Sequence, residues 1–321
     1  MRSRIGLVNA AGLGAALAVA LVAASYGAHP APAAARPPLA AVETVALPGG
    51  GRGVRDATGE VVELRPYRRI LAASTVADRL LHELAEPDRI VAVTAFGRAE
   101  SPWAYQQADK PTLAGVDDLE AVLALAPDLV VLNSYGATGK VTRLREHGIA
   151  VFDLGEMRGA AVLVRDIHVV ATLLGHPERG QRLAASWQRR FAAVAAALGS
   201  RPRRRAVYVA TYGGKLFGGT RDSSYGDVLT AAGLIDAAAA AGYRGWPQYA
   251  IEQLLGLDPE LIVTKPGMPG ELCRIPGLDR LRPCRLPGGF AEVEAAVLDD
   301  PGLPMLDAAE AIAAAAYPTI R

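Results

Sequence analysis

One sequence pattern occurs twice in this chain, and it restricts the possible folds more than any other feature. Each copy has a short helical stretch, a proline, an acidic residue and then an apolar run with strand character. The copies match in register from Leu119 to Val131 and from Ile251 to Val263. Such an internal repeat predicts two lobes built on one plan, with Glu120 and Glu252 at equivalent helix starts.

The segments around each copy alternate between short apolar runs and helical stretches, which is typical of a parallel α/β sheet. The first half has predicted strands at 70–73, 90–95, 129–133 and 150–154, and predicted helices at 76–85, 119–126 and 139–147. The second half has predicted strands at 206–210 and 261–264, and predicted helices at 225–232, 251–255 and 306–316. We therefore expect an α/β protein with two Rossmann-like lobes, each containing a parallel sheet.

An alanine-rich helical stretch at 160–199 separates the two halves and is interrupted only from Gly175 to Pro177. After Pro177 about twenty residues follow without a helix breaker, enough for roughly 30 Å of helix. We expect a single long helix that joins the lobes as a stiff strut and keeps lobe closure small, unless the break acts as a hinge. The expected organisation is a signal peptide and leader (1–35), a linker and short hairpin (36–68), an N-terminal lobe (69–159), the strut (160–199) and a C-terminal lobe (200–321).

The first residues have the layout of a secretory signal, because Arg2 and Arg4 precede an apolar run from Ile5 to Ala24. The prolines and small residues that follow fit cleavage between Ala28 and Ala35. An uncleaved membrane anchor is the alternative interpretation of the same run. No cysteine lies near this segment, so a lipid anchor is not expected. The prediction is an exported, periplasmic protein.

Charge and cysteine content narrow the possible partners. The 34 basic and 33 acidic side chains leave a net charge of +1, which argues against a nucleic-acid or other polyanionic partner. The two cysteines, Cys273 and Cys284, lie in a proline- and glycine-rich stretch, and in an oxidising compartment they are expected to form a local disulfide. Two cysteines without a nearby histidine do not make a zinc site, so no metal site is expected.

No catalytic signature is present: the sequence has no G-x-S-x-G elbow, no P-loop and no H-E-x-x-H helix. The glycine run at 49–53 does not lie between a strand and a helix as a dinucleotide-binding loop would. We therefore expect neither an enzyme nor a cofactor. A receptor for a bare metal ion stays an alternative, although the histidines fall within or at the ends of predicted helices: His82, His147, His168 and His176.

Several phrases of the sequence resemble one protein family. They are Asp118-Leu119-Glu120 through Pro127-Asp128-Leu129-Val130, Ser224-Tyr225-Gly226-Asp227-Val228-Leu229 through Gly233, and Trp246-Pro247-Gln248. From about Arg69 to Pro318 the chain is similar to the periplasmic binding proteins of cobalamin, ferric-siderophore and haem uptake. The resemblance implies two lobes joined by one long helix.

The resemblance also implies a role for Glu120 and Glu252. In that family the glutamate at each helix start pairs with arginines of an ABC permease dimer, which works with a cytoplasmic ATPase. The repeat places the two carboxylates alike, so they suit a two-fold symmetric partner. The alternative explanation is that each carboxylate only complements its own helix N-terminus. The binding protein itself is expected to be a monomer.

Ligands of two-lobed α/β proteins bind outside the carboxyl ends of the strands, so the loops there supply the candidate contacts. Aromatic side chains gather in these loops although they make up only 6% of the chain. They suit a flat, partly apolar ligand, and the cationic side chains among them suit acidic groups. The predicted contacts are Trp246, Phe96, Trp103, Tyr105, Tyr135, Tyr212, Arg221, Tyr243 and Lys265.

Tyr225 and Asp227 are expected to start a helix beside the cleft rather than to touch ligand. Tyr105, Tyr135 or Tyr225 would nevertheless suit haem iron as a phenolate ligand. The predicted function is capture of a metal chelate (cobalamin, haem or a ferric siderophore) for an ABC importer. An exported sensor of the same fold and a receptor for free metal ions are the alternatives.

Overall fold

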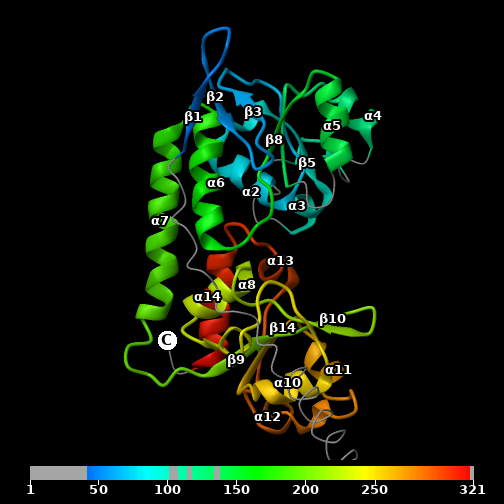
Figure 1. The fold of residues 1–321 in the computed structure, drawn as a ribbon, viewed down its shortest axis with the longest axis vertical. Coiled ribbons are helices and arrows are strands. Elements are labelled where there is room, and N and C mark those ends of the chain that lie inside the picture. Colours follow the sequence, from blue (N-terminus) through cyan, green and yellow to red (C-terminus); the bar gives the residue numbers. More distant parts are fainter. Residues whose placement is uncertain (1–41, 101–107, 114–117, 134–137, 319–321) are drawn as a thin grey trace, which may run out of the picture.

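The computed structural model describes residues 42–100, 108–113, 118–133 and 138–318. They form two α/β lobes, one above the other in Figure 1, with a pair of helices along one side. Each lobe contains a parallel sheet, so the fold class predicted from the sequence is confirmed.

The N-terminal lobe has a five-stranded parallel sheet in the order β6-β5-β4-β7-β8. Its strands are β4 (Ile70–Ala72), β5 (Ile90–Thr94), β6 (Thr112–Leu113), β7 (Leu129–Leu132) and β8 (Ala150–Asp153). The connecting helices are α2 (Thr75–Leu84), η1 (Pro87–Arg89), α3 (Ala95–Glu100), α4 (Leu119–Ala124) and α5 (Thr138–Glu146). β4 and β7 are buried along their whole length, which explains why they are continuous apolar runs in the sequence.

The C-terminal lobe has a four-stranded parallel sheet in the order β12-β9-β14-β15 and a small antiparallel sheet in the order β10-β11-β13. The strands are β9 (Arg205–Tyr208), β10 (Ala210–Tyr212), β11 (Lys215–Phe217), β12 (Ile235–Asp236), β13 (Gln248–Tyr249), β14 (Leu261–Thr264) and β15 (Phe290–Glu292). The helices are α8 (Ser224–Ala231), α9 (Ala237–Ala240), α10 (Ile251–Leu257), α11 (Met268–Leu272), η3 (Leu278–Arg280), α12 (Arg282–Arg285), α13 (Ala295–Leu298) and α14 (Met305–Ala316). The predicted disulfide between Cys273 and Cys284 is present and ties the end of α11 to α12.

A fourth sheet, which is antiparallel, precedes the N-terminal lobe and packs onto it. Its strands are β1 (Thr44–Ala46), β2 (Arg52–Arg55) and β3 (Val61–Glu63), so the range 36–68 holds three paired strands where the sequence predicts a linker and a short hairpin. Buried Asp56 anchors this sheet, because its carboxylate pairs with Arg145 of α5 at 2.6 Å. The backbone N–H of Ala57 donates to the carbonyl of Asp153 at 2.9 Å.

The repeat seen in the sequence is also a structural unit. In each lobe a helix (α4 or α10) leads through a proline into a buried central strand (β7 or β14). The residue before each proline, Ala126 or Asp258, adopts the left-handed conformation with a φ of 43°. The same unusual backbone at equivalent positions shows that the two copies turn in the same way.

Equivalent polar contacts hold the two copies in place. The carboxylate of Asp128 accepts the backbone N–H of Arg69 at 2.9 Å, and that of Glu260 accepts the backbone N–H of Arg205 at 2.8 Å. The side chains of the same two arginines donate to carbonyls where the repeat helices end. Arg69 donates to Leu125 and Ala126, just after α4, and Arg205 donates to Leu257, the last residue of α10. The acidic residue after each proline therefore fastens the helix end to the neighbouring strand.

The helical stretch between the lobes folds into two helices, α6 (Ala160–Leu173) and α7 (Pro177–Ala196). The break at Gly175 to Pro177 is a tight turn, so α7 packs back along α6 (Figure 1). α6 contacts α2 and β2 of the N-terminal lobe, whereas α7 also contacts α8 and α14 of the C-terminal lobe. The 20-residue α7 is therefore the long connecting helix, and α6 is part of the N-terminal lobe rather than of the strut.

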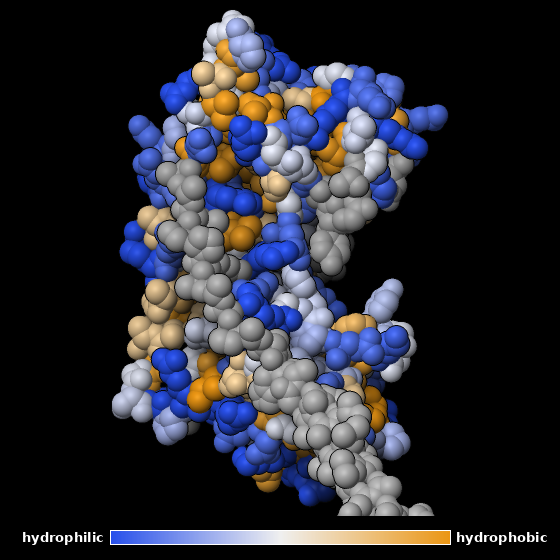
Figure 2. Space-filling view, in the orientation of Figure 1, coloured by the Kyte–Doolittle hydropathy of each residue, from blue (hydrophilic) through white to orange (hydrophobic). Residues whose placement is uncertain are grey.

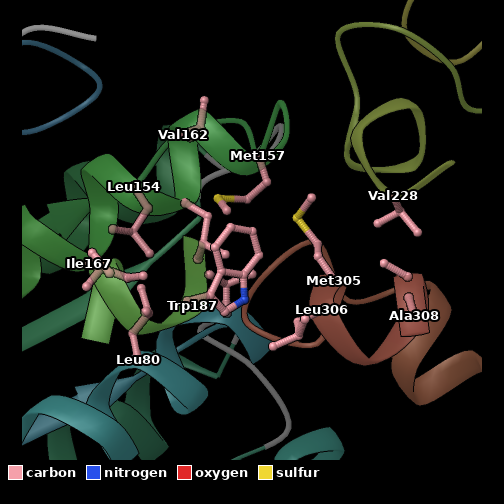
Figure 3. Close-up of a cluster of buried hydrophobic side chains, with 14 of the residues drawn as sticks. Leu80, Leu154, Met157, Val162, Ile167, Trp187, Val228, Met305, Leu306 and Ala308 are labelled. Carbon is pink, nitrogen blue, oxygen red and sulfur yellow. The ribbon is translucent and has the colours of Figure 1, made fainter. Parts of the chain in front are cut away.

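Both lobes share one hydrophobic core, and Trp187 of α7 lies within it (Figure 3). Figure 3 shows Leu80 of α2 and Ile167 of α6 on one side of the indole and Met305 of α14 on the other. The indole Nε1 donates to the carbonyl of Leu303 at 3.0 Å, so the buried ring is also hydrogen-bonded. Separating the lobes would expose this apolar surface, which costs about 25 cal/mol per Å².

Two polar contacts reinforce the junction. Buried Arg79 of α2 donates from Nε to Oδ2 of buried Asp300 at 2.7 Å. Asp227 of α8 accepts the backbone N–H of Ala160 at 2.7 Å and so caps α6 from the opposite lobe. Gly159 has a φ of 110°, and a side chain there would collide with the Asp227 carboxylate, so this position requires glycine.

We predict that Arg79→Met lowers the free energy of unfolding by about 3–5 kcal/mol, because it leaves a buried carboxylate without its partner. The control is Arg190→Met, which breaks the exposed 3.2 Å pair with Glu310 and should cost no more than about 1 kcal/mol. Urea unfolding followed by circular dichroism measures both. Equal losses in the two variants would contradict the assigned role of Arg79.

Candidate ligand-binding cleft

A pocket of about 240 Å³ lies between the lobes, and both lobes line it. Ser74, Asn133 and Gly155 follow β4, β7 and β8, so the N-terminal wall is built at the carboxyl ends of these strands. The C-terminal wall includes Tyr225 at the start of α8 and Trp246 ahead of β13. Figure 2 shows the molecule hollowed between the lobes on the side away from α7.

Hydrogen bonds fix the N-terminal wall of the pocket. The Ser74 hydroxyl donates to Oδ1 of Asn133 at 2.7 Å and accepts the N–H of Ala77, which caps α2. Asn133 Nδ2 donates to the carbonyl of Gly155 at 2.9 Å. Glu156, the next residue in the lining, accepts from Arg158 at 2.6 Å. Three successive strand ends are thus linked before any ligand arrives.

The C-terminal wall includes the Asp299 carboxylate and Tyr225, which stacks on buried Tyr208. The rings of Tyr225 and Tyr208 lie 3.8 Å apart between centroids and nearly parallel. The Tyr225 hydroxyl donates to Oδ1 of Asp299 at 3.1 Å, and Lys265 forms an ion pair with the same carboxylate. Burial raises the pKa of Tyr225 and of Tyr208, so both phenols stay protonated at neutral pH.

Trp246 is the most exposed large aromatic side chain lining this pocket, with 43% of its surface accessible. Backbone hydrogen bonds hold its loop on both sides, from Gly218 N–H to the Pro247 carbonyl at 2.8 Å and from Thr220 N–H to the Gly245 carbonyl at 3.0 Å. An exposed indole on a fixed backbone is a ready surface on which a flat ligand can stack.

The other predicted contacts have different surroundings. Lys265 lies behind the pocket lining, where Asp299 holds its charge. The ring of Tyr243 packs edge to face on that of Tyr249, with 5.5 Å between the ring centroids. Tyr212 is 81% exposed in the β10–β11 hairpin, and neither it nor Arg221 lines this pocket. Phe96 lies in α3 and its side chain is outside the described part, as are Trp103, Tyr105 and Tyr135 altogether.

Among the described lining residues, Trp246 alone was a predicted contact, and the sequence analysis missed Tyr225, Glu156 and Asp299 among others. Tyr225 lies in the first turn of α8 beside the cleft, as expected, and it also lines the pocket. Its place after a serine pair at a helix start was the available signal. Asp299 follows the short helix α13, for which the sequence has no strand-end signal.

Asp78 positions the segment that follows β5 beside the cleft. Its half-buried carboxylate accepts the N–H of Thr94 at 2.9 Å and also accepts from the Thr94 hydroxyl, which in turn accepts the N–H of Gly97. A Cβ on Gly97 would collide with the same carboxylate, so glycine is needed for the close approach. Burial raises the pKa of Asp78 to about 6.

Glu120 and Glu252 occupy equivalent places in the first turns of α4 and α10, and both are exposed. Asp118 already caps α4 by accepting the N–H of Ala121 at 3.0 Å. At α10, Gln253 accepts the N–H of Ala250 at 2.8 Å. Other side chains therefore satisfy these helix starts, which leaves the two glutamates accessible to a partner.

The sequence matches the periplasmic binding protein family over residues 70–280, a range that includes most of both lobes. The chain belongs to this family. Its members bind solutes, so the prediction that the chain is not an enzyme is confirmed. In the part of the chain that the structure describes, no helix is both long and apolar enough to cross a bilayer.

The curated relatives that the sequence matches are cobalamin-binding proteins. The cobalamin-binding protein of Halobacterium salinarum is 29% identical over 205 residues, and the match covers 61% of this chain and 53% of that protein. The chain thus spans about half the length of the curated relatives it matches.

Solved structures of low identity share the fold. The periplasmic vitamin B12-binding protein of Vibrio cholerae has a TM-score of 0.63 at 20% identity, covering 78% of this chain and 97% of that one. A periplasmic heme-binding protein of Pseudomonas aeruginosa has a TM-score of 0.67 at 23% identity, covering 79% and 94%.

We predict that Asp78→Asn stabilises the protein at about pH 8 but not at about pH 4. The pKa of Asp78 in the folded state lies above its unfolded value near 3.9. The contribution of Asp78 to the free energy of unfolding is therefore greatest below about pH 4 and is lost as the pH rises through about 6. Asparagine still accepts from Thr94 but does not ionise, so we expect a gain of roughly 1–3 kcal/mol at the higher pH. Urea unfolding at both pH values tests this, and a pH-independent difference would contradict it.

Proposed function

We propose that this chain is the periplasmic substrate-binding component of an ABC importer and that its cleft captures a corrinoid. The observation that carries the proposal is the pocket between the lobes, where exposed Trp246 shares the lining with hydroxyl, amide and carboxylate groups. The corrin ring is flat and apolar, and its rim carries neutral amides. Rings stack on tryptophan, and amide N–H groups donate to carboxylates.

The charges in the pocket favour a corrinoid over haem. Among the described lining residues there is no arginine, lysine or histidine, whereas Glu156 and Asp299 contribute carboxylates. Both acids already have cationic partners, Arg158 and Lys265. Haem carries two propionates, which are best held by arginine or lysine. The curated cobalamin-binding relatives agree with this preference.

The pocket is small for a whole corrinoid. Its volume of about 240 Å³ lies below the range of about 300–1,000 Å³ usual for small-molecule sites. We infer that one edge of the ring enters the pocket while the remainder occupies the hollow seen in Figure 2. Phe96, Trp103, Tyr105 and Tyr135 stay predicted contacts for that outer part.

Delivery of the ligand is assigned to Glu120 and Glu252, which we propose dock on arginines of the permease dimer. A sensor without a transporter would have no use for two matched, accessible carboxylates. A receptor for a bare metal ion gains no support, because the described residues contain no cluster of three or more His, Cys, Asp and Glu that would hold one. Export to the periplasm through an N-terminal signal belongs to the same proposal.

We predict that cyanocobalamin binds the purified protein more tightly than haemin, and that Trp246→Ala weakens corrinoid binding by about 1–3 kcal/mol through loss of stacking. Isothermal titration calorimetry measures both. Tyr212→Ala is the matched control, since this exposed aromatic side chain does not line the pocket. Tighter binding of haemin, or unchanged affinity in the Trp246 variant, would contradict the assignment.

We also predict that the double variant Glu120→Arg/Glu252→Arg binds corrinoid normally but supports no uptake, because reversed charges repel the permease arginines. Uptake is measured in cells that express the chain with its permease and ATPase, and affinity is measured on the purified variant. Glu146→Arg/Glu178→Arg reverses two other exposed acids and should leave uptake intact. Normal uptake by the first variant would refute the docking role.

A further inference from the structure

A surface rich in arginine covers the end of the C-terminal lobe that lies away from the cleft. It consists of residues 201–205, 258–260 and 271–288, which we call the arginine surface. β9 and β14 begin at this end, with Arg205 and Leu261, whereas the cleft lies at the carboxyl ends of the strands. The arginine surface is therefore separate from the proposed ligand site.

Direct contacts join the three segments. Arg204 donates from Nη2 to the carbonyls of Glu260 and Gly288, at 2.9 Å in each case. Arg282 pairs with Asp258 at 2.8 Å. The disulfide, with 5.6 Å between the Cα atoms of Cys273 and Cys284, brings the chain at Arg274 close to the chain at Arg285. The segments thus form one continuous surface.

The arginine surface is positively charged although the chain as a whole is nearly neutral. Its ranges contain eight arginines and four acidic residues, an excess of four positive charges, whereas the whole chain has a net charge of +1. Arg203 and Arg280 are exposed, and their side chains make no hydrogen bond or ion pair with the described part of the chain. These guanidinium groups are available to an anionic partner.

An apolar side chain stands out among these charges. Leu286 is 61% exposed and is one of four exposed large hydrophobic residues in the described part of the chain. It lies between Arg285 and exposed Pro287. A partner that matches this combination has many anionic groups beside an apolar phase. Phospholipid head groups fit, because guanidinium binds phosphate in a bidentate manner and acyl chains lie directly beneath.

We propose that the arginine surface binds an anionic phospholipid bilayer, with Leu286 entering the interface between head groups and acyl chains. An acidic protein would match the arginines but would leave Leu286 unexplained. The surface also borders the helix of Glu252, because Gly277 lies against Ile251 at the start of α10. Lipid contact at this place would hold the C-terminal lobe at the membrane in which a permease resides.

The test uses protein-free vesicles, so its result does not depend on the proposed importer or its ligand. We expect the intact chain to sediment with vesicles containing about 30% phosphatidylglycerol, to stay in solution with pure phosphatidylcholine, and to be released by about 0.5 M salt. Arg203→Glu/Arg280→Glu should reduce the partition coefficient roughly tenfold or more. Leu286→Ser should reduce it severalfold without changing its dependence on salt.

A matched control separates surface chemistry from net charge. Arg182→Glu/Arg189→Glu makes the same charge change at two exposed positions of α7 and should leave vesicle binding near the level of the unmodified chain. Circular dichroism confirms that each variant is folded. Equal losses in the two double variants, or binding to an acidic peptide but not to vesicles, would overturn the proposal.

Discussion

The packing of Trp187 between the lobes is the contact on which the remaining architecture depends. The indole belongs to α7, but the apolar side chains around it come from α2, α6 and α14, so neither lobe has a complete core without the other. Arg79 with Asp300 and Asp227 with the start of α6 add polar contacts to the same junction. Opening the lobes would break all of these together, which makes hinge motion at this junction unfavourable.

A fixed junction has a consequence for recognition. If the lobes barely move, selectivity must come from groups already in place, and the pocket walls have that property. Asn133 is held by Ser74 and Gly155, and Asp299 is held by Tyr225 and Lys265. Groups that are oriented before binding lose little side-chain entropy when the ligand arrives. Trp246, on a loop fixed by its backbone, would add the proposed stacking surface at equally low entropic cost.

Local sequence patterns predicted the repeat, both parallel sheets, the disulfide and the helix that joins the lobes, because each depends on residues close in the chain. The pocket was harder to predict. Asn133 and Gly155 lie at the ends of predicted strands and Trp246 lies in a phrase that resembles the family, and all three line the pocket. Lys265 looked free only because its partner Asp299 follows a short helix with no pattern of its own. Arg79 and Asp300 are 221 positions apart, so only the assembled lobes bring them together.

The net charge of the chain does not predict where charge gathers on the folded surface. A net charge of +1 argues against a polyanionic partner when the charges are evenly spread, since the field of the whole molecule is then weak. Folding spreads them unevenly: arginines far apart in sequence gather at the amino ends of β9 and β14, while the pocket at the carboxyl ends is lined by carboxylates. At about 0.15 M salt the Debye length is about 8 Å, so a partner senses only the patch it touches. One lobe can therefore favour a neutral ligand at one end and an anionic surface at the other.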